Sequence, residues 1–383
     1  MKIVYLIAGT FNSGGMERVL ANKANWLVAH DYDVSVVTTD QRGRSPYFKM
    51  DDRIRHYDLD INYDDSNGKS FLRKTISFYR KQRQHRQRLT KLLCSLHADI
   101  TVCMFNNDAP FVYKIHDGSR KVLEVHFSKN KKLQYGRHGL WALADRWRTR
   151  QEERYVSRYD RFVVLTKEDQ ALWDVASHRS PLTSRITVIP NARTFVPRQQ
   201  SPLVNKRVVA IGRYDYQKGF DTLLYIWHLL SDRLNGWTLD IIGDGPLRQE
   251  MTLQLYQWHL TESVRLLPPT GDMASVYRDA SVLAMTSRYE GLPMVLLEAQ
   301  ACGLPIVSFA CQCGPRDVIT DGVDGYLIEN FDEHLFADRL FALMNDEALR
   351  QRMGSAALKS SQRYSEDTIM QQWDTLFKVT RKS

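Results

Sequence analysis

Glu290 and Glu298 are placed where two carboxylates can take part in ligand chemistry. Residues 282–285 form a short apolar run typical of a buried strand, and the polar loop that follows it contains Glu290. Pro293 suits the first turn of a helix and Gly303 suits its end, so Glu298 is expected inside a helix that begins just after Glu290. The two carboxylates are therefore expected to flank one helix N-terminus.

The same helix start offers backbone groups to an anion. Gly291 and Leu292 precede the predicted helix, so they and the residues after them present N–H groups that the helix itself does not use. Carboxylates beside such an anion site can accept hydrogen bonds from hydroxyl groups. A ligand with phosphate at one point and hydroxyls at two others, such as a nucleotide sugar, matches this pattern. A single Glu on a helix is more often a solvated acid, so the inference depends on the whole string.

A second pair of candidate residues follows the strand predicted at 207–213. Arg213 and Lys218 share the loop at the end of this strand, where two cations can neutralise a diphosphate and Arg can do so through two parallel hydrogen bonds. Ordinary surface charge is the simpler explanation for these two residues alone. The strand predicted at 237–242 is followed by a tight turn that begins at Gly243.

Length and composition indicate two soluble domains. The chain has 383 residues, more than one typical domain, and its 43% hydrophobic content is ordinary for a protein with packed cores. The apolar run at residues 1–9 is too short for a signal peptide or a membrane span, and we expect it to form the first buried strand. Five cysteines, an odd number, and no secretory signal favour a reducing cytoplasm.

Positive charge is concentrated in the first half of the chain. Residues 1–190 contain 33 Lys and Arg against 21 Asp and Glu, a net charge of +12, whereas residues 191–383 contain 20 against 23, a net charge of −3. Residues 66–98 contain no acidic residue, and their spacing predicts a basic amphipathic helix. Such a helix often presents only a solvated face. If the basic half instead binds a partner, the candidates are an anionic membrane surface, a pyrophosphate-bearing acceptor and nucleic acid. No recognition-helix motif supports nucleic acid.

Short apolar runs alternate with helical patterns in both halves, which predicts α/β architecture with parallel sheets. A linker that contains Pro197 and Pro202 and shows little periodicity separates the halves. Helices in the second half are predicted at 220–233, 332–345 and 364–379. The predicted segments are a first domain over 1–190, a second domain over 206–363 and a final helical segment over 364–383.

The first half has candidate site residues of its own. The strand predicted at 3–8 leads into a loop with Gly14 and Gly15, where a substrate can approach the backbone closely, although a plain turn explains the glycines equally well. The spacing is not Gly-x-Gly-x-x-Gly, which gives little support to a dinucleotide site. His126 follows the strand predicted at 121–125, so it is expected at the carboxyl end of a sheet, where ligands bind. A lone His in that place is more often structural.

Together these strings resemble one enzyme family, the retaining glycosyltransferases of family 4, also called glycosyl transferases group 1. The family implies two Rossmann-like α/β domains facing each other across a cleft, known as the GT-B fold, and a last helix that crosses back to the first domain. The strings that carry the resemblance are Gly14-Gly15-x-Glu17, Glu124-x-His126, Gly212-Arg213 with Gln217-Lys218-Gly219, and Glu290-Gly-Leu-Pro with Glu298.

The resemblance implies a role for each candidate residue. His126 would lie beside the donor sugar, Glu290 near the sugar hydroxyls and Glu298 at the nucleotide ribose. Arg213 and Lys218 would hold the leaving diphosphate, which would itself assist the incoming hydroxyl. The implied catalytic residues are His126, Arg213, Lys218 and Glu290. The implied donor-binding residues are Gly14, Gly15, Arg213, Lys218, Gly243, Glu290, Gly291, Leu292 and Glu298.

The predicted function is transfer of a sugar from a nucleotide-sugar donor to a glycan or polyprenyl-pyrophosphate-linked acceptor in cell-surface polysaccharide or lipopolysaccharide biosynthesis. A UDP-sugar is favoured over GDP-mannose. The enzyme is expected to be cytoplasmic and peripheral on the inner face of the plasma membrane, with no metal, no other cofactor and no nucleic acid.

Three alternatives remain open at this point. The chain could be a nucleotide-sugar epimerase on the same scaffold, or a non-catalytic protein that binds polyanions or nucleic acid. A metal-dependent transferase would need an Asp-x-Asp motif, for which Asp31-Tyr-Asp33 and Asp58-Leu-Asp60 are short matches.

Overall fold

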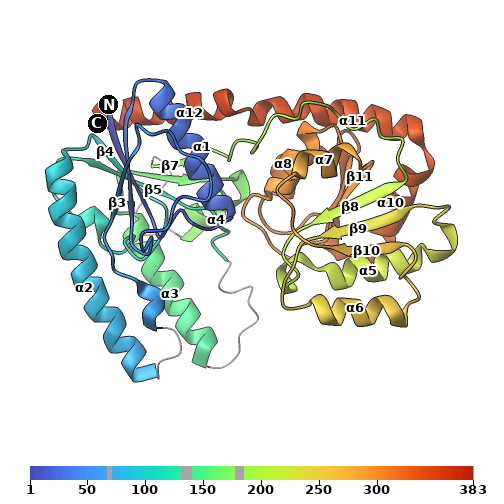
Figure 1. Cartoon of the computed structure of the whole chain (residues 1–383), viewed down its shortest axis with the longest axis horizontal. Helices are drawn as coiled ribbons and strands as arrows, with labels where there is room; N and C mark the ends of the chain where they lie inside the picture. Colours follow the sequence, from blue (N-terminus) through green and yellow to red (C-terminus); the bar gives the residue numbers. More distant parts are fainter. Residues whose placement is uncertain (67–70, 131–139, 177–184, 383) are drawn as a thin grey trace. The chain divides into compact units, whose positions relative to one another are not determined.

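The chain folds into two compact α/β units (Figure 1). The first unit comprises Met1–Pro190 together with Ile369–Ser383, and the second comprises Asn191–Thr368. Each unit is built on one sheet whose strands pair in parallel, as the alternation of strand and helix patterns predicts. The computed structural model describes residues 1–66, 71–130, 140–176 and 185–382.

The sheet of the first unit has the strand order β3-β2-β1-β4-β5-β6-β7. Apolar and β-branched residues fill β1, β2 and β4, which are buried because helices cover the sheet. Strand β1 pairs with β2 on one side and with β4 on the other, so the strand order reverses between β1 and β4, and open α/β sheets bind ligands at such a switch point. The strands are β1 (Lys2–Ile7), β2 (Asp33–Thr38), β3 (Arg55–Asp58), β4 (Ile100–Cys103), β5 (Arg120–Glu124), β6 (Arg161–Val164) and β7 (Ile186–Val188).

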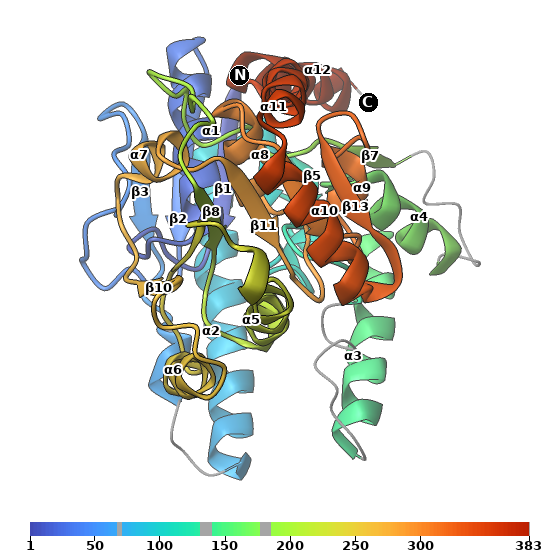
Figure 2. The same cartoon turned by 90° about the vertical axis from the view of Figure 1, so that its right-hand side faces the viewer.

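The helices of the first unit pack apolar stripes against this sheet. In α1 (Gly15–Ala29), buried residues recur at the helical spacing that the sequence shows. Both views show that α2 and α3 continue past the ends of the strands (Figures 1 and 2). The remaining helices are α2 (Phe71–Leu96), α3 (Leu140–Val156), α4 (Lys167–Ala176) and α12 (Glu366–Lys382).

The last helix, α12, contributes most of its length to the first unit. Its buried face includes Trp373 and Phe377, neither of which is exposed to solvent. The hydroxyl of Tyr32 donates a hydrogen bond to Asp374, so a polar contact at the rim accompanies the apolar one.

The second unit repeats the same topology with six strands in the order β10-β9-β8-β11-β12-β13. The order reverses between β8 and β11, and these two strands are direct neighbours. Its core contains the fully buried Trp227 and Phe336. The strands are β8 (Arg207–Ile211), β9 (Thr238–Ile242), β10 (Val264–Leu267), β11 (Val282–Met285), β12 (Ile306–Phe309) and β13 (Gly325–Ile328). The helices are α5 (Phe220–Leu229), α6 (Arg248–Gln257), α7 (Met273–Arg278), α8 (Met294–Ala301), α9 (Pro315–Val318), α10 (Glu333–Asn345) and α11 (Glu347–Ser361).

Two helices differ from the sequence prediction. The helix predicted at 220–233 ends as α5 at Leu229, and a short 3-10 turn, Ser231–Arg233, follows it. The sequence patterns did not predict α11 as a separate helix. Among the described residues, no helix has both the length and the apolar character that crossing a membrane requires.

Candidate active site

The candidate donor site lies at the switch point of the second unit. The loops that follow β8 and β11 are held together there because their strands are neighbours. The amide of Gln217 donates a hydrogen bond of 3.0 Å to the carbonyl of Tyr289, and the N–H of Arg288 donates one of 2.8 Å to the carbonyl of Gln217. The hydroxyl of Thr286 donates to the carbonyl of Gly219 at 2.9 Å. The two loops therefore form one hydrogen-bonded surface.

Lys218 and Glu290 meet on this surface. The ammonium Nζ of Lys218 lies 2.7 Å from Oε1 of Glu290, and the amide of Gln217 lies 3.3 Å from Oε2. The side chains of Lys218 and Glu290 are 18% and 8% exposed, so the pair is screened from water more than an ordinary surface ion pair. One predicted phosphate-binding cation and one predicted hydroxyl-binding carboxylate thus share a single partly buried position.

Arg213 stands on the same loop but points outward. Its guanidinium Nε lies 3.8 Å from Asp215, and its side chain is 72% exposed. Asp215 also caps the short turn that carries Lys218, because its carboxylate accepts the backbone N–H of Lys218 at 3.3 Å. The loop therefore offers one cation held in place and one that can move toward a ligand.

Gly243 allows the ends of β8 and β9 to lie close together. A Cβ atom at Gly243 would come within 1.9 Å of the carbonyl oxygen of Gly212, which no side chain can tolerate. The N–H of Gly212 in turn donates to the carbonyl of Ile242 at 3.0 Å. The role of Gly243 seen here is to position the Arg213 loop, and contact with a ligand stays a prediction.

The N-terminus of α8 faces the same edge of the sheet as the loop of Glu290. Pro293 is the N-cap of α8 in an extended conformation, and Gly291 and Leu292 immediately precede it. The backbone N–H groups at such a helix start carry partial positive charge and bind anions well. The predicted anion site and the Lys218–Glu290 pair therefore belong to one loop–helix junction.

Glu298 lies inside α8 and is held by two hydroxyl groups. Thr194 donates to its Oε1 at 2.5 Å, and the hydroxyl of Tyr277 donates to its Oε2 at 2.7 Å. Burial together with the negative charge of Glu298 raises the pKa of Tyr277 well above its usual value, so this hydroxyl remains a donor. Because an ionised carboxylate offers about four acceptor positions, Glu298 can still accept hydrogen bonds from a ligand.

The first unit positions the remaining candidate residues. Gly14 is the N-cap of α1 and Gly15 is its first residue, in the loop after β1. The neighbouring Thr10 is held by Gln41, whose side-chain oxygen accepts the N–H of Thr10 at 2.9 Å. His126 follows β5, and its Nε2 lies 3.1 Å from Oε1 of Glu124. The predicted residues thus stand at the carboxyl ends of β1 and β5.

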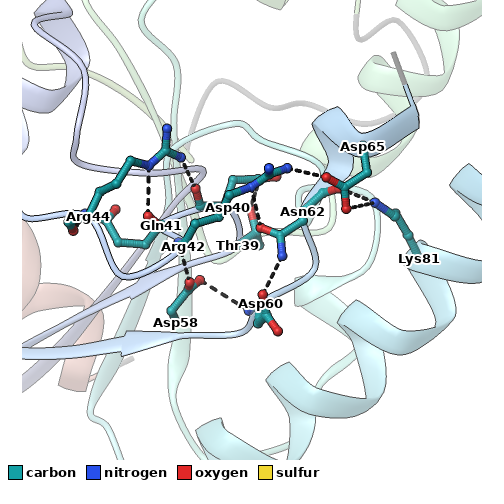
Figure 3. Close-up of polar contacts among 10 residues, drawn as sticks. All are labelled: Thr39, Asp40, Gln41, Arg42, Arg44, Asp58, Asp60, Asn62, Asp65 and Lys81. Carbon is teal, nitrogen blue, oxygen red and sulfur yellow. Dashed lines mark hydrogen bonds and ion pairs between the residues drawn. The ribbon is translucent and has the colours of Figure 1, made fainter. Parts of the chain in front are cut away.

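The Asp-x-Asp match at Asp58 and Asp60 is part of a structural network (Figure 3). The carboxylate of Asp58 accepts the N–H groups of Arg42 at 3.0 Å and of Asp60 at 3.2 Å. Asp60 accepts a hydrogen bond from the side chain of Asn62. Within the described part of the chain, no group of three His, Cys, Asp or Glu side chains is arranged to hold a metal ion. These two acids therefore tie together the loops after β2 and β3.

Family comparisons identify the protein class to which this architecture belongs. Residues 13–193 match the family described as Glycosyltransferase Family 4, and residues 193–360 match the family described as Glycosyl transferases group 1. The chain belongs to the family 4 glycosyltransferases. The two matched segments cover most of both units of this glycosyltransferase, so the assignment does not depend on one motif.

Individual relatives and solved structures agree with the family. The amylovoran biosynthesis glycosyltransferase AmsD of Erwinia amylovora is 28% identical over 382 residues, with 98% of this chain and 99% of the relative covered. A Campylobacter jejuni α-1,4-N-acetyl-D-galactosaminyltransferase, named for a diNAcBac-PP-undecaprenol-linked GalNAc substrate, is 26% identical, with 97% of each chain covered. The crystal structure of S. aureus TarM with fondaparinux, alpha-GlcNAc-glycerol and UDP has a TM-score of 0.78 and 19% identity, covering 98% and 99% of the chains. The structural likeness shows that this glycosyltransferase has the GT-B fold.

Several residues that shape the candidate site of this glycosyltransferase were not predicted from its sequence. Thr194 and Tyr277 hold Glu298 from segments 104 and 21 positions away, and Gln217 holds Glu290 from 73 positions away. Nothing near Thr194 or Tyr277 in the chain distinguishes them from other polar or buried residues. Gln217 belongs to the motif Gln217-Lys218-Gly219, but its contact with Glu290 depends on the pairing of β8 with β11.

Proposed function

We propose that this glycosyltransferase moves a sugar from a UDP-sugar, with retention of anomeric configuration and without a metal ion, to a growing surface glycan. The acceptor is a glycan or an oligosaccharide linked to polyprenyl pyrophosphate. The observation that carries the proposal is the Lys218–Glu290 pair at the switch point, 2.7 Å apart, beside the start of α8. This junction unites a cation, a carboxylate and backbone N–H groups as a sugar diphosphate requires.

The proposed chemistry uses fixed donors at the leaving group. As the bond between the sugar and the diphosphate breaks, negative charge grows on the phosphate oxygens and positive charge grows at the anomeric carbon. Lys218, Arg213 and the N–H groups around Gly291 and Leu292 are assigned to the diphosphate, where preorganised donors lower the barrier. Glu290 is assigned to the sugar hydroxyls, and its contact with Lys218 keeps both groups in place before the donor binds.

Retention follows in this proposal from the position of the leaving phosphate. One phosphate oxygen accepts the proton of the incoming acceptor hydroxyl on the face from which the phosphate departs, so the new bond forms on that face. The carboxylate of Glu290 is engaged by Lys218 and Gln217 and is assigned to binding instead of to nucleophilic attack. His126 is assigned to the donor sugar, as the family resemblance implies.

Relatives support the choice of donor and acceptor class. UDP is present in the TarM crystal, which supports a uridine nucleotide. The names of the Erwinia and Campylobacter relatives refer to amylovoran biosynthesis and to a PP-undecaprenol-linked glycan, which supports an acceptor of this kind. A screen of UDP- and GDP-sugars that measures released nucleotide tests the proposal. Release from a UDP-sugar is expected to rise when a lipid-linked acceptor is added. Release confined to GDP-sugars would reject the uridine assignment, and none with any donor would reject the transfer itself.

Glu298→Ala is expected to weaken UDP binding about 10- to 100-fold, because a hydrogen bond to a charged group contributes about 1.5–3 kcal/mol. The dissociation constant for UDP, measured by calorimetry, checks this result. Glu250→Ala is the matched control, since Glu250 lies in the first turn of α6 with its side chain exposed. Equal UDP affinity in the two variants would contradict the ribose assignment.

We also assign the basic face of α2 to an anionic lipid surface. Arg80, Arg83 and Arg86 are exposed, and the helix also exposes the apolar side chains of Ile76 and Tyr79, each 69% accessible. Basic and aromatic residues on one helix suit the headgroup region of an anionic bilayer. A surface hollow of about 750 Å³ adjoins the helix and is lined by Arg83, Arg86, Gln87, Thr90, Lys91, Lys114, Ile115 and His116. Its cations suit the phosphate of a lipid or of a lipid-linked acceptor.

Replacing Arg80, Arg83 and Arg86 together with Gln is expected to reduce binding to phosphatidylglycerol vesicles about 100-fold, because each basic residue near such a surface contributes about 1 kcal/mol. Vesicle sedimentation measures the change. The control replaces the exposed Arg339, Arg352 and Lys359 of the second unit with Gln and removes the same total charge. If both triple variants bind vesicles equally, net charge rather than the α2 surface governs the interaction.

A further inference from the structure

A buried charge cluster lies beside His126 in the first unit. Lys23 of α1 forms an ion pair with Glu124 at the end of β5, and these residues are 4% and 0% exposed. The Nε2 atom of His126 lies 3.1 Å from the same carboxylate oxygen, and the His126 side chain is 5% exposed. One carboxylate oxygen is thus shared by an ammonium group and an imidazole ring.

This cluster is costly to bury, which suggests a role beyond packing. Burial alone would raise the pKa of Glu124, but the charge of Lys23 and the contact with His126 outweigh it and lower that pKa to about 2. Glu124 is therefore ionised at any working pH. An apolar pair of similar volume would fill the same space at least as well, because the desolvation of two buried charges offsets most of their attraction.

Buried aromatic residues lie around the charge pair. The ring of Trp373, from α12, lies 3.8 Å from Nζ of Lys23, and Trp373 is itself fully buried. The phenol of Tyr5 on β1 is also buried, and its pKa is raised by burial and by the charge of Glu124. One strand and two helices, β1, α1 and α12, therefore enclose the charge pair at the end of β5.

The contact with Glu124 affects which ring nitrogen of His126 carries the proton. Nε2 is close to the carboxylate, but its N–H direction does not make an aligned hydrogen bond in this conformation, so the contact is electrostatic. A carboxylate at 3.1 Å favours the proton on Nε2 and leaves Nδ1 as the acceptor. The cluster can therefore favour the Nε2–H tautomer, and the attraction of Nε2 to the carboxylate keeps that side of the ring turned toward Glu124.

We propose that Glu124, held by Lys23 under Trp373, is a positioning residue that sets the ring orientation and the Nε2–H tautomer of His126 for sugar transfer. The proposal rests on the proposed function, because it needs His126 beside the donor sugar. Lys23 acts through Glu124, and Glu124 acts through His126. Neither residue is assigned to contact the substrate.

The decisive variant removes the charge pair without leaving an unpaired buried charge. Glu124→Leu alone is expected to lower the Tm by about 10 °C, because Lys23 loses its partner. Lys23→Met combined with Glu124→Leu is expected to restore the Tm to the wild-type value or above it. Its kcat is nevertheless expected to remain about 10-fold lower, with the donor KM changed less than about threefold, because a misplaced ring affects the reacting geometry more than donor binding. Wild-type kcat in this folded double variant would overturn the proposal.

A matched control removes another buried pair from the opposite end of β5. Lys121 and Asp117 have side chains 6% and 0% exposed, and they form an ion pair near the start of that strand. Lys121→Met combined with Asp117→Leu is expected to leave kcat unchanged. Equal losses of kcat in the two double variants would show that any change of a buried pair in this sheet lowers turnover, and would overturn the proposal.

His126→Ala separates this proposal from the proposed function. The Lys23 and Glu124 changes are expected to have no further effect on kcat in that background, because they act through the missing ring. If His126→Ala lowers kcat but the double variant does not, the positioning role fails and the proposed function stands. If His126→Ala itself has no effect on kcat, the assignment of His126 to the donor sugar fails.

Ring ¹⁵N chemical shifts give a test that is independent of transfer activity. With the His126 signals assigned by comparison with His126→Ala, the wild-type ring is expected to carry its proton on Nε2. The double variant is expected to show a mixture of tautomers. An Nδ1–H tautomer in the wild type, or the same shifts in both proteins, would overturn the proposal even if no donor has been found.

Discussion

Lys218→Ala is expected to lower kcat about 100- to 1,000-fold, the usual loss when one fixed donor to a developing negative charge is removed. Lys218 is held by Glu290 at 2.7 Å and by the loop that Asp215 caps, so its charge is in place before the diphosphate departs. Arg213 cannot replace it fully, because its side chain is 72% exposed and must be ordered during each turnover. Steady-state release of UDP from the preferred donor measures the effect.

Stability is expected to change much less than turnover in Lys218→Ala. Glu290 keeps the amide of Gln217 as a donor, so the Tm is expected to fall by only about 5 °C. Lys206→Ala is the matched control, because Lys206 precedes β8 at the opposite end of the strand and donates to the carbonyl of Asn235 at 2.8 Å. Normal kcat in folded Lys218→Ala would show that another group holds the diphosphate.

Glu290→Gln is expected to lower kcat/KM about 30- to 150-fold, which corresponds to about 2–3 kcal/mol for hydrogen bonds to a charged acceptor. The carboxylate accepts from Lys218 through one oxygen and from Gln217 through the other. In the glutamine variant, an NH₂ group must face one of these two donors. The substitution therefore weakens the acceptor offered to the sugar hydroxyls and breaks the contact with either Lys218 or Gln217.

The control for Glu290→Gln is Glu329→Gln, which removes the carboxylate of an exposed ion pair with Arg316 in the same unit. That change is expected to leave kcat/KM unchanged, since exposed pairs contribute little. In addition, Glu290→Gln is expected to cause a smaller loss in the Lys218→Ala background than in the wild type, because only its contact with the sugar hydroxyls then remains to be lost. Full additivity of the two losses would contradict a shared role.

The local sequence was sufficient to predict the candidate residues on the loops that follow β8 and β11. Arg213, Lys218, Glu290 and the start of α8 each follow a short buried strand, and strand ends in a parallel sheet meet at one edge. The structure brings Lys218 and Glu290 into contact, as their placement on neighbouring strands allows. Their binding roles are predictions that the variants above test.

Local sequence patterns could not predict the contacts between distant segments of the chain. Lys23 and Glu124 are 101 positions apart, and only the stacking of α1 on the sheet brings them together. From the sequence, Glu124 was visible as part of Glu-x-His, but Lys23 was one of many basic residues in a positively charged half. The partner of a buried charge depends on the tertiary fold, which spacing along a strand does not specify.

Helix α11 shows why one element was missed. Gly354 lies near its middle, and glycine ordinarily weakens a helix there. In the structure, a Cβ atom at this position would lie 2.4 Å from the carbonyl oxygen of Gly303, at the end of α8. The glycine therefore permits close packing of α11 against the end of α8, and this tertiary contact outweighs the low helix propensity.

A crystal structure of the protein with UDP tests most directly whether the switch point of the second unit binds the donor nucleotide. The diphosphate oxygens are expected within about 3 Å of Lys218 Nζ and of the N–H groups that begin α8, with the ribose hydroxyls on Glu298. Nucleotide density confined to the first unit, for example against the arginines of α2, would contradict this assignment.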